Sequence, residues 1–272
     1  MMPVYNGLSQ IKASLESLKR QTYENWECII VDDGSNDGTS QYLDSIVSDK
    51  FVVYHFTKNM GRPYARQKAL ELASGEYIAM LDADDLIHPY KLEIQVQILD
   101  KNPNVYLVAS GICSFGKSCD FIRIRCKGDN HIHKFSIDER FPVAHACSML
   151  RREWAINFEY NPLLSLGQDI DFLRRYLNGK EYVCLDKILY YYSELDSVSK
   201  AKIMKAYKLY FIKFFKAKEY LNSIEYIIKY ISSFFIFPFV KTQNILKSRG
   251  TSPTFEEFEE YNKYCKSILL EY

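Results

Sequence analysis

The first 110 residues alternate between short apolar runs and amphipathic segments, and this alternation limits the possible folds more than any other feature. The apolar runs are predicted as strands at Met2–Tyr5, Trp26–Val31, Phe51–Phe56 and Glu76–Leu81. Apolar residues recur with helical spacing at Ile11, Leu15 and Leu18, and again over Tyr64–Ala73. Short strands separated by helices favour a mostly parallel sheet covered on both faces, and therefore an α/β fold.

Polar residues stand where three of these predicted strands end. Tyr5 ends the first run, Asp33 follows the second, and Asp82 follows the fourth. Ligands of open α/β sheets bind beyond the carboxyl ends of the strands, so we expect these side chains to share one site.

Asp82 and Asp84 flank a single residue in the sequence AMLDADDL. Two carboxylates just after a strand suit Mg²⁺ or Mn²⁺, which bind through one or two carboxylates together with substrate phosphates. The alternative is an acidic turn that caps the following helix, with Asp85 as the N-cap before Pro89. Taken alone, this motif favours the alternative.

Two glycine-containing motifs point to a nucleotide. In IIVDDGSNDG (29–38), Asp33 can accept hydrogen bonds from a base and Gly34 permits a sharp turn, although an Asx-rich turn explains the pattern equally well. In NMGRPYARQKA (59–69), Arg66 can reach a base or a diphosphate, or can simply be a solvated charge on a helix.

Five motifs together resemble family 2 glycosyltransferases, which are inverting enzymes of the GT-A fold that use nucleotide-diphosphate sugars. They are PVYNG (3–7), QTYENWECIIVDDGSNDGT (21–39), NMGRPYAR (59–66), GEYIAMLDADD (75–85) and GQDIDF (167–172). Their order and spacing over about 170 residues carry the resemblance, which predicts a Rossmann-like, mostly parallel sheet.

The resemblance implies a donor site for a UDP-sugar. Pro3 and Tyr5 would line the base pocket, with the Tyr5 ring against uracil. Asp33 would accept the uracil N3–H, and Arg66 would contact the base edge or the phosphates. Asp82 would face the ribose and the donor sugar.

The resemblance also implies a metal ligand and a catalytic base. Asp84 would bind Mn²⁺ or Mg²⁺, and Asp169 would remove the proton of the acceptor hydroxyl. The family often has Glu before this base, whereas this chain has Gln168. Alternatively, Asp169 only caps a helix that begins at Ile170. The family also tends to have Arg and His in the segment matching 190–200, and this chain has neither there.

Charge is distributed unevenly along the chain. The totals of 35 basic and 34 acidic residues exclude a pervasively basic protein, so we expect no nucleic-acid partner. Residues 1–199 carry a net charge of −5, residues 200–249 carry +9 and residues 250–272 carry −3. We therefore predict a catalytic domain over 1–199 and a basic, aromatic-rich helical segment over 200–272.

The basic segment has an amphipathic pattern. Its first predicted helix places apolar residues on one face, at Ile203, Met204, Tyr207, Tyr210, Phe211, Phe214 and Phe215. Basic faces combined with aromatic residues favour a helix that lies on an anionic membrane surface, and the alternative is packing against the catalytic domain. Without a signal sequence, a long apolar run or a cysteine framework, we expect a cytoplasmic protein, peripheral on the inner face of the cell membrane.

These observations predict an inverting, metal-dependent transferase. It would move a hexose or N-acetylhexosamine from a UDP-sugar to a lipid-linked saccharide, carried on polyprenyl diphosphate, in O-antigen or capsule synthesis. A non-catalytic UDP-sugar-binding scaffold is the main alternative. A sugar-nucleotide pyrophosphorylase comes last, because PVYNG lacks a Gly-rich phosphate loop.

Overall fold

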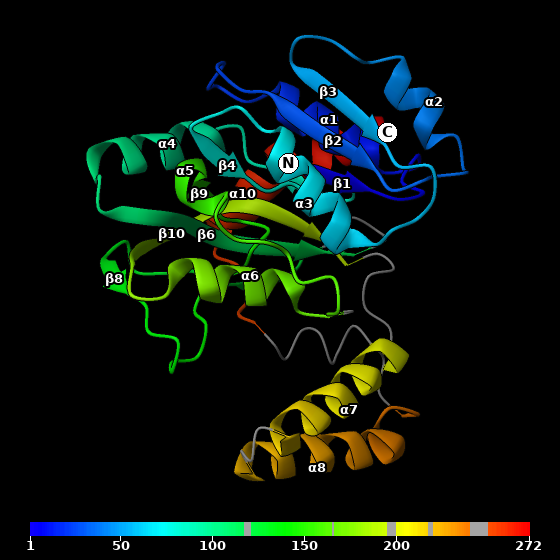
Figure 1. The fold of residues 1–272 in the computed structure, drawn as a ribbon, viewed down its shortest axis with the longest axis vertical. Coiled ribbons are helices and arrows are strands. Elements are labelled where there is room, and N and C mark those ends of the chain that lie inside the picture. Colours follow the sequence, from blue (N-terminus) through cyan, green and yellow to red (C-terminus); the bar gives the residue numbers. More distant parts are fainter. Residues whose placement is uncertain (117–120, 165, 195–199, 217–219, 240–249) are drawn as a thin grey trace.

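The computed structural model describes residues 1–116, 121–164, 166–194, 200–216, 220–239 and 250–272 (Figure 1). The strands are β1 Met2–Val4, β2 Cys28–Asp32, β3 Phe51–His55, β4 Tyr77–Ala79, β5 Leu86–Ile87, β6 Val105–Phe115, β7 Phe121–Arg125, β8 Ile132–Lys134, β9 Met149–Arg151 and β10 Glu181–Ser193. The helices are α1 Ile11–Lys19, α2 Thr39–Asp44, α3 Arg62–Leu72, α4 Lys91–Lys101, α5 Arg152–Ala155, α6 Gln168–Leu177, α7 Lys200–Lys216, α8 Tyr220–Ile236, α10 Phe255–Tyr261 and α11 Ser267–Glu271, with a π-helical turn, η1, at Asn262–Lys266.

The N-terminal strands form a parallel sheet, as the sequence predicts. Their order in the sheet is β3-β2-β1. All five residues of β2 are buried, because helices cover both faces. Met1 joins this sheet to β4: its amino group donates to the Ala79 carbonyl at 2.8 Å, and its carbonyl accepts from Leu81 N at 3.1 Å. The carboxyl ends of β1, β2 and β4 therefore open at one edge.

The crossover helices lie on opposite faces because the strand order reverses at β1. Right-handed connections from β1 to β2 and from β2 to β3 place α1 and α2 on one side, and the return from β3 to β4 places α3 on the other. Helix α3 packs on β1 and β2, where Figure 1 shows it crossing in front of the sheet. At such a reversal, open α/β sheets bind ligands beyond the carboxyl ends of their strands.

The second part of the sheet is mixed, in the order β4-β9-β6-β10-β5. Strands β6 and β10 run parallel, whereas β9 and β5 are antiparallel to their neighbours. Strand β7 pairs antiparallel with β6. Strand β10 is the longest, with thirteen residues, and pairs with β5, β6 and β8.

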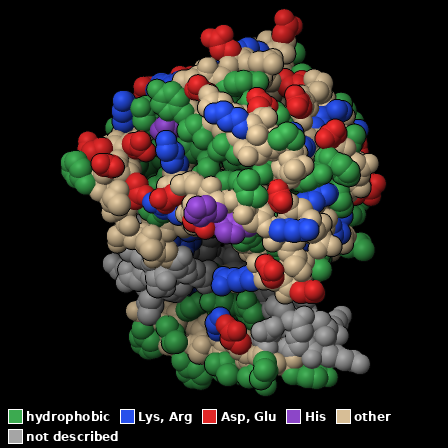
Figure 2. All heavy atoms as spheres, turned by 90° about the vertical axis from the view of Figure 1, so that its left-hand side faces the viewer, with side chains coloured by type: hydrophobic (Ala, Val, Ile, Leu, Met, Phe, Trp, Pro, Cys, Tyr) green, Lys and Arg blue, Asp and Glu red, His purple; other side chains and the backbone are tan. Residues whose placement is uncertain are grey.

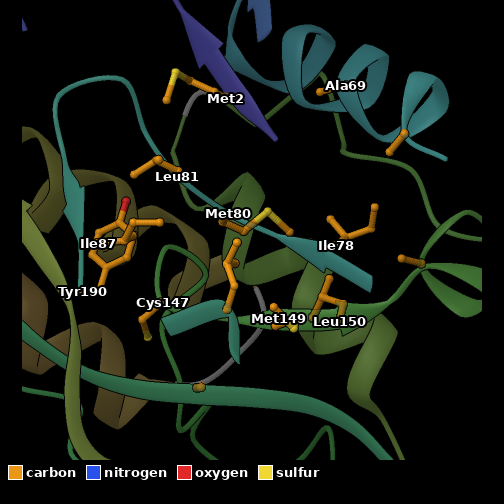
Figure 3. Close-up of a cluster of buried hydrophobic side chains, with 14 of the residues drawn as sticks. Met2, Ala69, Ile78, Met80, Leu81, Ile87, Cys147, Met149, Leu150 and Tyr190 are labelled. Atoms are coloured by element: carbon orange, nitrogen blue, oxygen red, sulfur yellow. The ribbon is translucent and has the colours of Figure 1, made fainter. Parts of the chain in front are cut away.

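Apolar side chains from both parts of the sheet meet in one buried cluster (Figure 3). Ile78 and Met80 from the β4 segment lie beside Met149 and Leu150 of β9, and all four are at most 4% exposed. This packing fixes the strand that leads into the Asp82–Asp85 turn.

The C-terminal helices return to the N-terminal region. Tyr261, Cys265 and Ile268 are buried in a cluster that includes Phe115 and Tyr191. Arg20, the residue that follows α1, also forms an ion pair with Glu271. The boundary at residue 199 stays a prediction, and residues 255–271 pack on the domain that precedes it.

Helices α7 and α8 form a hairpin at the lower end of the molecule in Figure 1. Ile203 is buried, and Tyr207 and Phe211 of the predicted apolar face are half-buried. This face contacts α8, since Tyr207 packs against Tyr226 with ring centroids 6.3 Å apart. Among the described residues, no helix is long and apolar enough to cross a membrane.

Candidate active site

Hydrogen bonds fasten the loop after β1 to the loop after β2. The backbone N–H of Asn6 donates to Ser35 Oγ at 2.8 Å, and Asn36 N–H donates to Asn6 Oδ1 at 2.9 Å. These bonds tie the predicted PVYNG and DDGSND motifs into one rim. Pro3 lies within β1, paired with Val31, whereas the ring of Tyr5 is 49% exposed at the rim.

Asp33 fastens a third motif to the same edge. Its buried carboxylate accepts the backbone N–H groups of Met60 at 2.6 Å and Gly61 at 2.9 Å. The turn at Gly34, with φ of +74°, lies so close to the 58–59 backbone that an added Cβ would stand 2.5 Å from Lys58 C. Only glycine therefore permits this approach.

Asp32, which the sequence analysis did not single out, supports the turn from below. Its carboxylate accepts hydrogen bonds from Ser35 N, Ser40 Oγ and His55 Nδ1 at 3.0, 2.5 and 2.8 Å. Burial acts to raise the pKa of Asp32, but these hydrogen bonds outweigh it and the pKa is lowered. Because side chains alternate along a strand, adjacent Asp32 and Asp33 serve opposite sides.

Arg66 lies under the site instead of at the surface of α3. It is 4% exposed, and its Nη2 donates to Asp82 Oδ1 at 3.2 Å. Burial opposes the charged guanidinium, yet the charges of Asp82 and then Asp169 raise the pKa of Arg66. Its Nη1 has no hydrogen-bond partner among the described residues. The burial of Arg66 excludes the alternative that its side chain is a solvated charge on the helix surface.

Asp85 anchors the DADD turn and is not a helix cap. Its buried carboxylate accepts from Tyr190 OH and from Ser193 N, both at 2.7 Å. The N-cap position of α4 belongs to Tyr90. Burial, together with Asp84 and Asp82, raises the pKa of Asp85 well above its usual value. Strand β10 therefore supplies the donors that hold the turn in place.

Asp84 is exposed, unlike its neighbour Asp85. The surrounding protein and then the charge of Asp82 raise the pKa of Asp84 to about 6, with Arg62 opposing. A cation beside Asp84 would stabilise the ionised carboxylate. No cluster of three or more acidic, His or Cys side chains within the described ranges could hold a metal by itself. Two carboxylates fit Mg²⁺ or Mn²⁺ only together with ligand phosphates.

Asp169 stands in the first turn of α6, which begins at Gln168 and not at Ile170. Gly167, with φ of +73°, precedes the helix. Asp169 is half-buried, and its Oδ1 accepts the N–H of Ile170 at 2.9 Å. The charge of Asp169 contributes to the raised pKa of Arg66, in agreement with a position of α6 near α3.

A buried aromatic group that the sequence analysis missed supports α6. Tyr160 stacks on Phe172 of α6 with ring centroids 4.2 Å apart, and His145 Nε2 is 2.7 Å from Tyr160 OH. Tyr160 N–H also donates to Gln67 of α3 at 3.1 Å. Helix α6 is thus tied to the helix that carries Arg66. In the sequence, the signal for this group is the presence of aromatic residues on both sides of the QDID motif, at Tyr160 and Phe172.

The predicted site residues therefore gather around one edge of the sheet. Tyr5, Asp33 and Asp84 lie on its rim, and Arg66 with Asp82 forms its floor. Of the 190–200 segment, residues 195–199 lie outside the described residues, and Ser197 and Ser199 with them.

Comparisons with known proteins agree with this arrangement. Residues 1–157 match the family model "Glycosyl transferase family 2". An uncharacterised glycosyltransferase of Rickettsia bellii is 38% identical over 106 residues, covering 39% of this chain and 15% of that protein. Escherichia coli WfgD, named UDP-Glc:alpha-D-GlcNAc-diphosphoundecaprenol beta-1,3-glucosyltransferase, is 41% identical over 106 residues, covering 38% of this chain and 40% of WfgD. The chain thus spans less than half the length of either relative.

The structure of Staphylococcus aureus TarS 1–349 in complex with UDP resembles the chain with a TM-score of 0.59 and 19% identity, over 99% of this chain and 79% of TarS 1–349. At this identity the likeness shows the fold. Since the family model covers more than half of the sequence, the chain belongs to glycosyl transferase family 2 and has the GT-A fold.

Proposed function

We propose that the chain transfers a hexose or N-acetylhexosamine from a UDP-sugar, with inversion, to a lipid-linked saccharide of a bacterial surface polysaccharide such as O-antigen or capsule. One observation carries the proposal: the loops after β1 and β2 and the buried pair of Arg66 with Asp82, at 3.2 Å, meet at one edge of the sheet. Tyr160 links α6, which carries Asp169, to α3, which carries Arg66, and this supports placing the carboxylates proposed for the donor and for the acceptor at the same edge. The name of WfgD and the UDP complex of TarS support the donor and acceptor classes.

The rim supplies the donor contacts. The exposed ring of Tyr5 offers a flat face for uracil. Asp33 already accepts two backbone N–H groups, and a carboxylate has about four acceptor positions, so it retains capacity for the uracil N3–H. The hydrogen bonds to Met60 and Gly61 hold that carboxylate in place before the nucleotide arrives.

Asp84 would hold Mg²⁺ or Mn²⁺ together with the diphosphate of the donor. Bound there, the cation neutralises the negative charge that develops on the departing UDP. Asp82 is free to face the ribose and donor sugar through the carboxylate oxygen that Arg66 does not engage. The guanidinium fixes the Asp82 side chain from beneath, so binding requires little reorganisation.

Asp169 is proposed as the general base. As the acceptor oxygen bonds to the anomeric carbon, the bond from that carbon to the diphosphate oxygen breaks, and the hydroxyl proton passes to Asp169. The transition state resembles an oxocarbenium ion, as in glycoside hydrolysis. A single displacement converts an α-linked donor into a β-linked product.

A lipid-linked acceptor is reached only at a membrane surface, and the proposed location is the cytoplasmic face. The net charge of +9 over residues 200–249 supports attraction to anionic lipid.

A screen of UDP-sugars with Mn²⁺, reading UDP release, tests the proposal. A glycosyltransferase releases UDP slowly from its own donor by hydrolysis, and faster when the acceptor is added. Binding of UDP with no release from any UDP-sugar would instead establish the scaffold alternative.

A further inference from the structure

Helix α8 directs small polar side chains toward its partner helix. Ser223 and Ser233 are each 2% exposed, and Ser223 Oγ donates to the Phe211 carbonyl of α7 at 3.5 Å. Tyr226, on the same face, packs against Tyr207. Small residues at this contact let the two helix backbones approach closely.

The opposite face of α8 is apolar and uncovered by any described residue. Its residues recur with helical spacing and are 52–86% exposed: Leu221, Ile224, Ile228, Ile231 and Phe235. Phe239, just beyond the helix, continues the row and is 88% exposed. We call these six residues the α8 apolar face. Figure 2 shows hydrophobic side chains gathered over this lower end of the molecule.

This arrangement reverses what water favours. A surface helix in water turns its apolar residues toward the core and its polar residues outward. Helices in lipid pack through small residues such as Ser, because the surrounding medium accepts apolar side chains. With buried serines and exposed isoleucines, α8 follows the second pattern.

Length and charge point to the membrane surface and not to its interior. Seventeen residues of α8 span about 26 Å at 1.5 Å per residue, less than the hydrocarbon core of about 30 Å. The exposed Glu225 at the edge of the α8 apolar face is paired with Lys229. The segment 200–249, to which the hairpin belongs, carries a net charge of +9. Such a charge attracts the segment to anionic headgroups.

We propose that the α8 apolar face inserts into the interface of an anionic membrane, with α8 lying parallel to the bilayer plane. The positive charge of the segment draws the hairpin toward anionic headgroups, while the six apolar side chains enter the acyl boundary. This inference deepens the proposed function, since it names the surface that would bring the enzyme to a lipid-linked acceptor.

Flotation of the full chain with vesicles tests the proposal. Vesicles of phosphatidylcholine containing about 30% phosphatidylglycerol should bind the protein, and vesicles of phosphatidylcholine alone should bind it at least tenfold more weakly. The triple variant Ile224→Ser, Ile228→Ser, Ile231→Ser should lose at least tenfold in partitioning to the anionic vesicles. Binding by this variant equal to that of the wild type would overturn the proposal.

A matched control substitutes exposed apolar residues elsewhere. Val47→Ser, Leu163→Ser, Leu270→Ser removes comparable exposed surface outside the hairpin and should leave partitioning unchanged. In a second measurement, Phe235→Trp should gain fluorescence quenching by brominated lipid that the wild type lacks. If the triple variant instead dissociates a wild-type dimer in light scattering, and neither protein binds vesicles, the face is a self-association surface and the membrane proposal fails.

UDP binding separates this inference from the proposed function. The triple variant should bind UDP with the affinity of the wild type, which also shows that it is folded. Vesicle binding without UDP binding in the wild type would leave the surface in place and remove the donor assignment.

Discussion

The edge of the sheet that carries the candidate site and the α7–α8 hairpin both bury polar side chains, but they do so for different reasons. At the edge, Asp32, Asp33 and Asp85 are buried carboxylates that each accept at least two hydrogen bonds. In the hairpin, buried serines face a neighbouring helix while isoleucines face outward. Buried ionised groups require such donors, whereas serines bury at little cost. The edge is therefore complete within the chain, and the hairpin lacks a covering partner among the described residues.

This comparison predicts that a substitution at the sheet edge reduces transfer activity without changing membrane binding. Asp169→Asn removes the proposed base, so UDP release in the presence of the acceptor should fall by about 10²–10⁴-fold, the contribution of general base catalysis. Calorimetry should find unchanged UDP affinity, and flotation should find unchanged vesicle binding. Asp171→Asn, which breaks an exposed pair with Arg175, serves as the control. Full activity in Asp169→Asn would refute the base assignment.

The second test concerns the metal at the edge. Asp84→Ala removes the exposed carboxylate, so Mn²⁺ should no longer increase the affinity for UDP, and transfer should fall by about 10²-fold because charge on the leaving group is less well neutralised. Titration calorimetry with UDP, with and without Mn²⁺, measures the first effect. Asp49→Ala, at another exposed carboxylate, should retain the Mn²⁺ response. If Mn²⁺ increased the UDP affinity of the Asp84 variant as much as that of the wild type, the proposed metal ligand would not be Asp84.

The third test concerns Lys91, a buried basic residue that, unlike the buried carboxylates of the sheet edge, makes no side-chain hydrogen bond to the described residues. Its Nζ has no hydrogen-bond partner among the described residues, and the side chain lines a cavity of about 400 Å³. Burial lowers the pKa of Lys91 to about 8 from 10.5. Lys91→Met should therefore raise the free energy of unfolding at pH 7 by about 1–3 kcal/mol.

The sign of the pH dependence follows from the lowered pKa. Between pH 8 and 10.5 the unfolded chain keeps the Lys91 proton that the folded chain releases, so the wild type gains stability as pH rises. The advantage of Lys91→Met should be full below pH 8 and vanish above pH 10.5. Denaturant unfolding at pH 7 and pH 10.5 checks this, and an advantage that grows with pH would contradict it.

The smallest effect is expected at the support of α6. Tyr160→Phe keeps the ring stacked on Phe172 but removes the hydroxyl next to His145, which should cost about 1 kcal/mol of stability. The kcat for transfer should fall severalfold while the Kd for UDP stays unchanged, since Tyr160 acts through the helix that carries Asp169. Tyr54→Phe, at a half-exposed ring, is the matched control. Unchanged kcat would limit Tyr160 to a structural role.

Sequence patterns predicted the elements whose signals are local. The parallel strands β1, β2 and β3 coincide with the predicted apolar runs, and the loops after β1 and β2 meet as expected. The GT-A fold followed from five motifs in order, and the family model confirms it.

Other features depend on contacts between distant residues. The carboxylate of Asp85 looked like a helix cap because Tyr190 and Ser193 stand more than 100 residues later. The sequence left a solvated Arg66 open as an alternative, because the burial of this side chain depends on the packing of α3 against the sheet. Part of the α7 face expected to meet lipid packs on α8 instead, through Tyr207 and Tyr226, since a neighbouring helix supplies an apolar partner within the chain.

Strand β10 also sets an order of events during synthesis. Tyr190 and Ser193 supply the hydrogen-bond donors to Asp85. The ribosome must therefore add residue 193 before the Asp82–Asp85 turn can make all of these bonds. Synthesis at about 5–20 residues per second leaves the emerged β1–β4 region waiting roughly 5–20 s for that strand. During this interval Asp85 has neither hydrogen-bond donor, and a nascent chain that stalls before residue 190 carries all five sequence motifs but not the bonds that hold the Asp82–Asp85 turn.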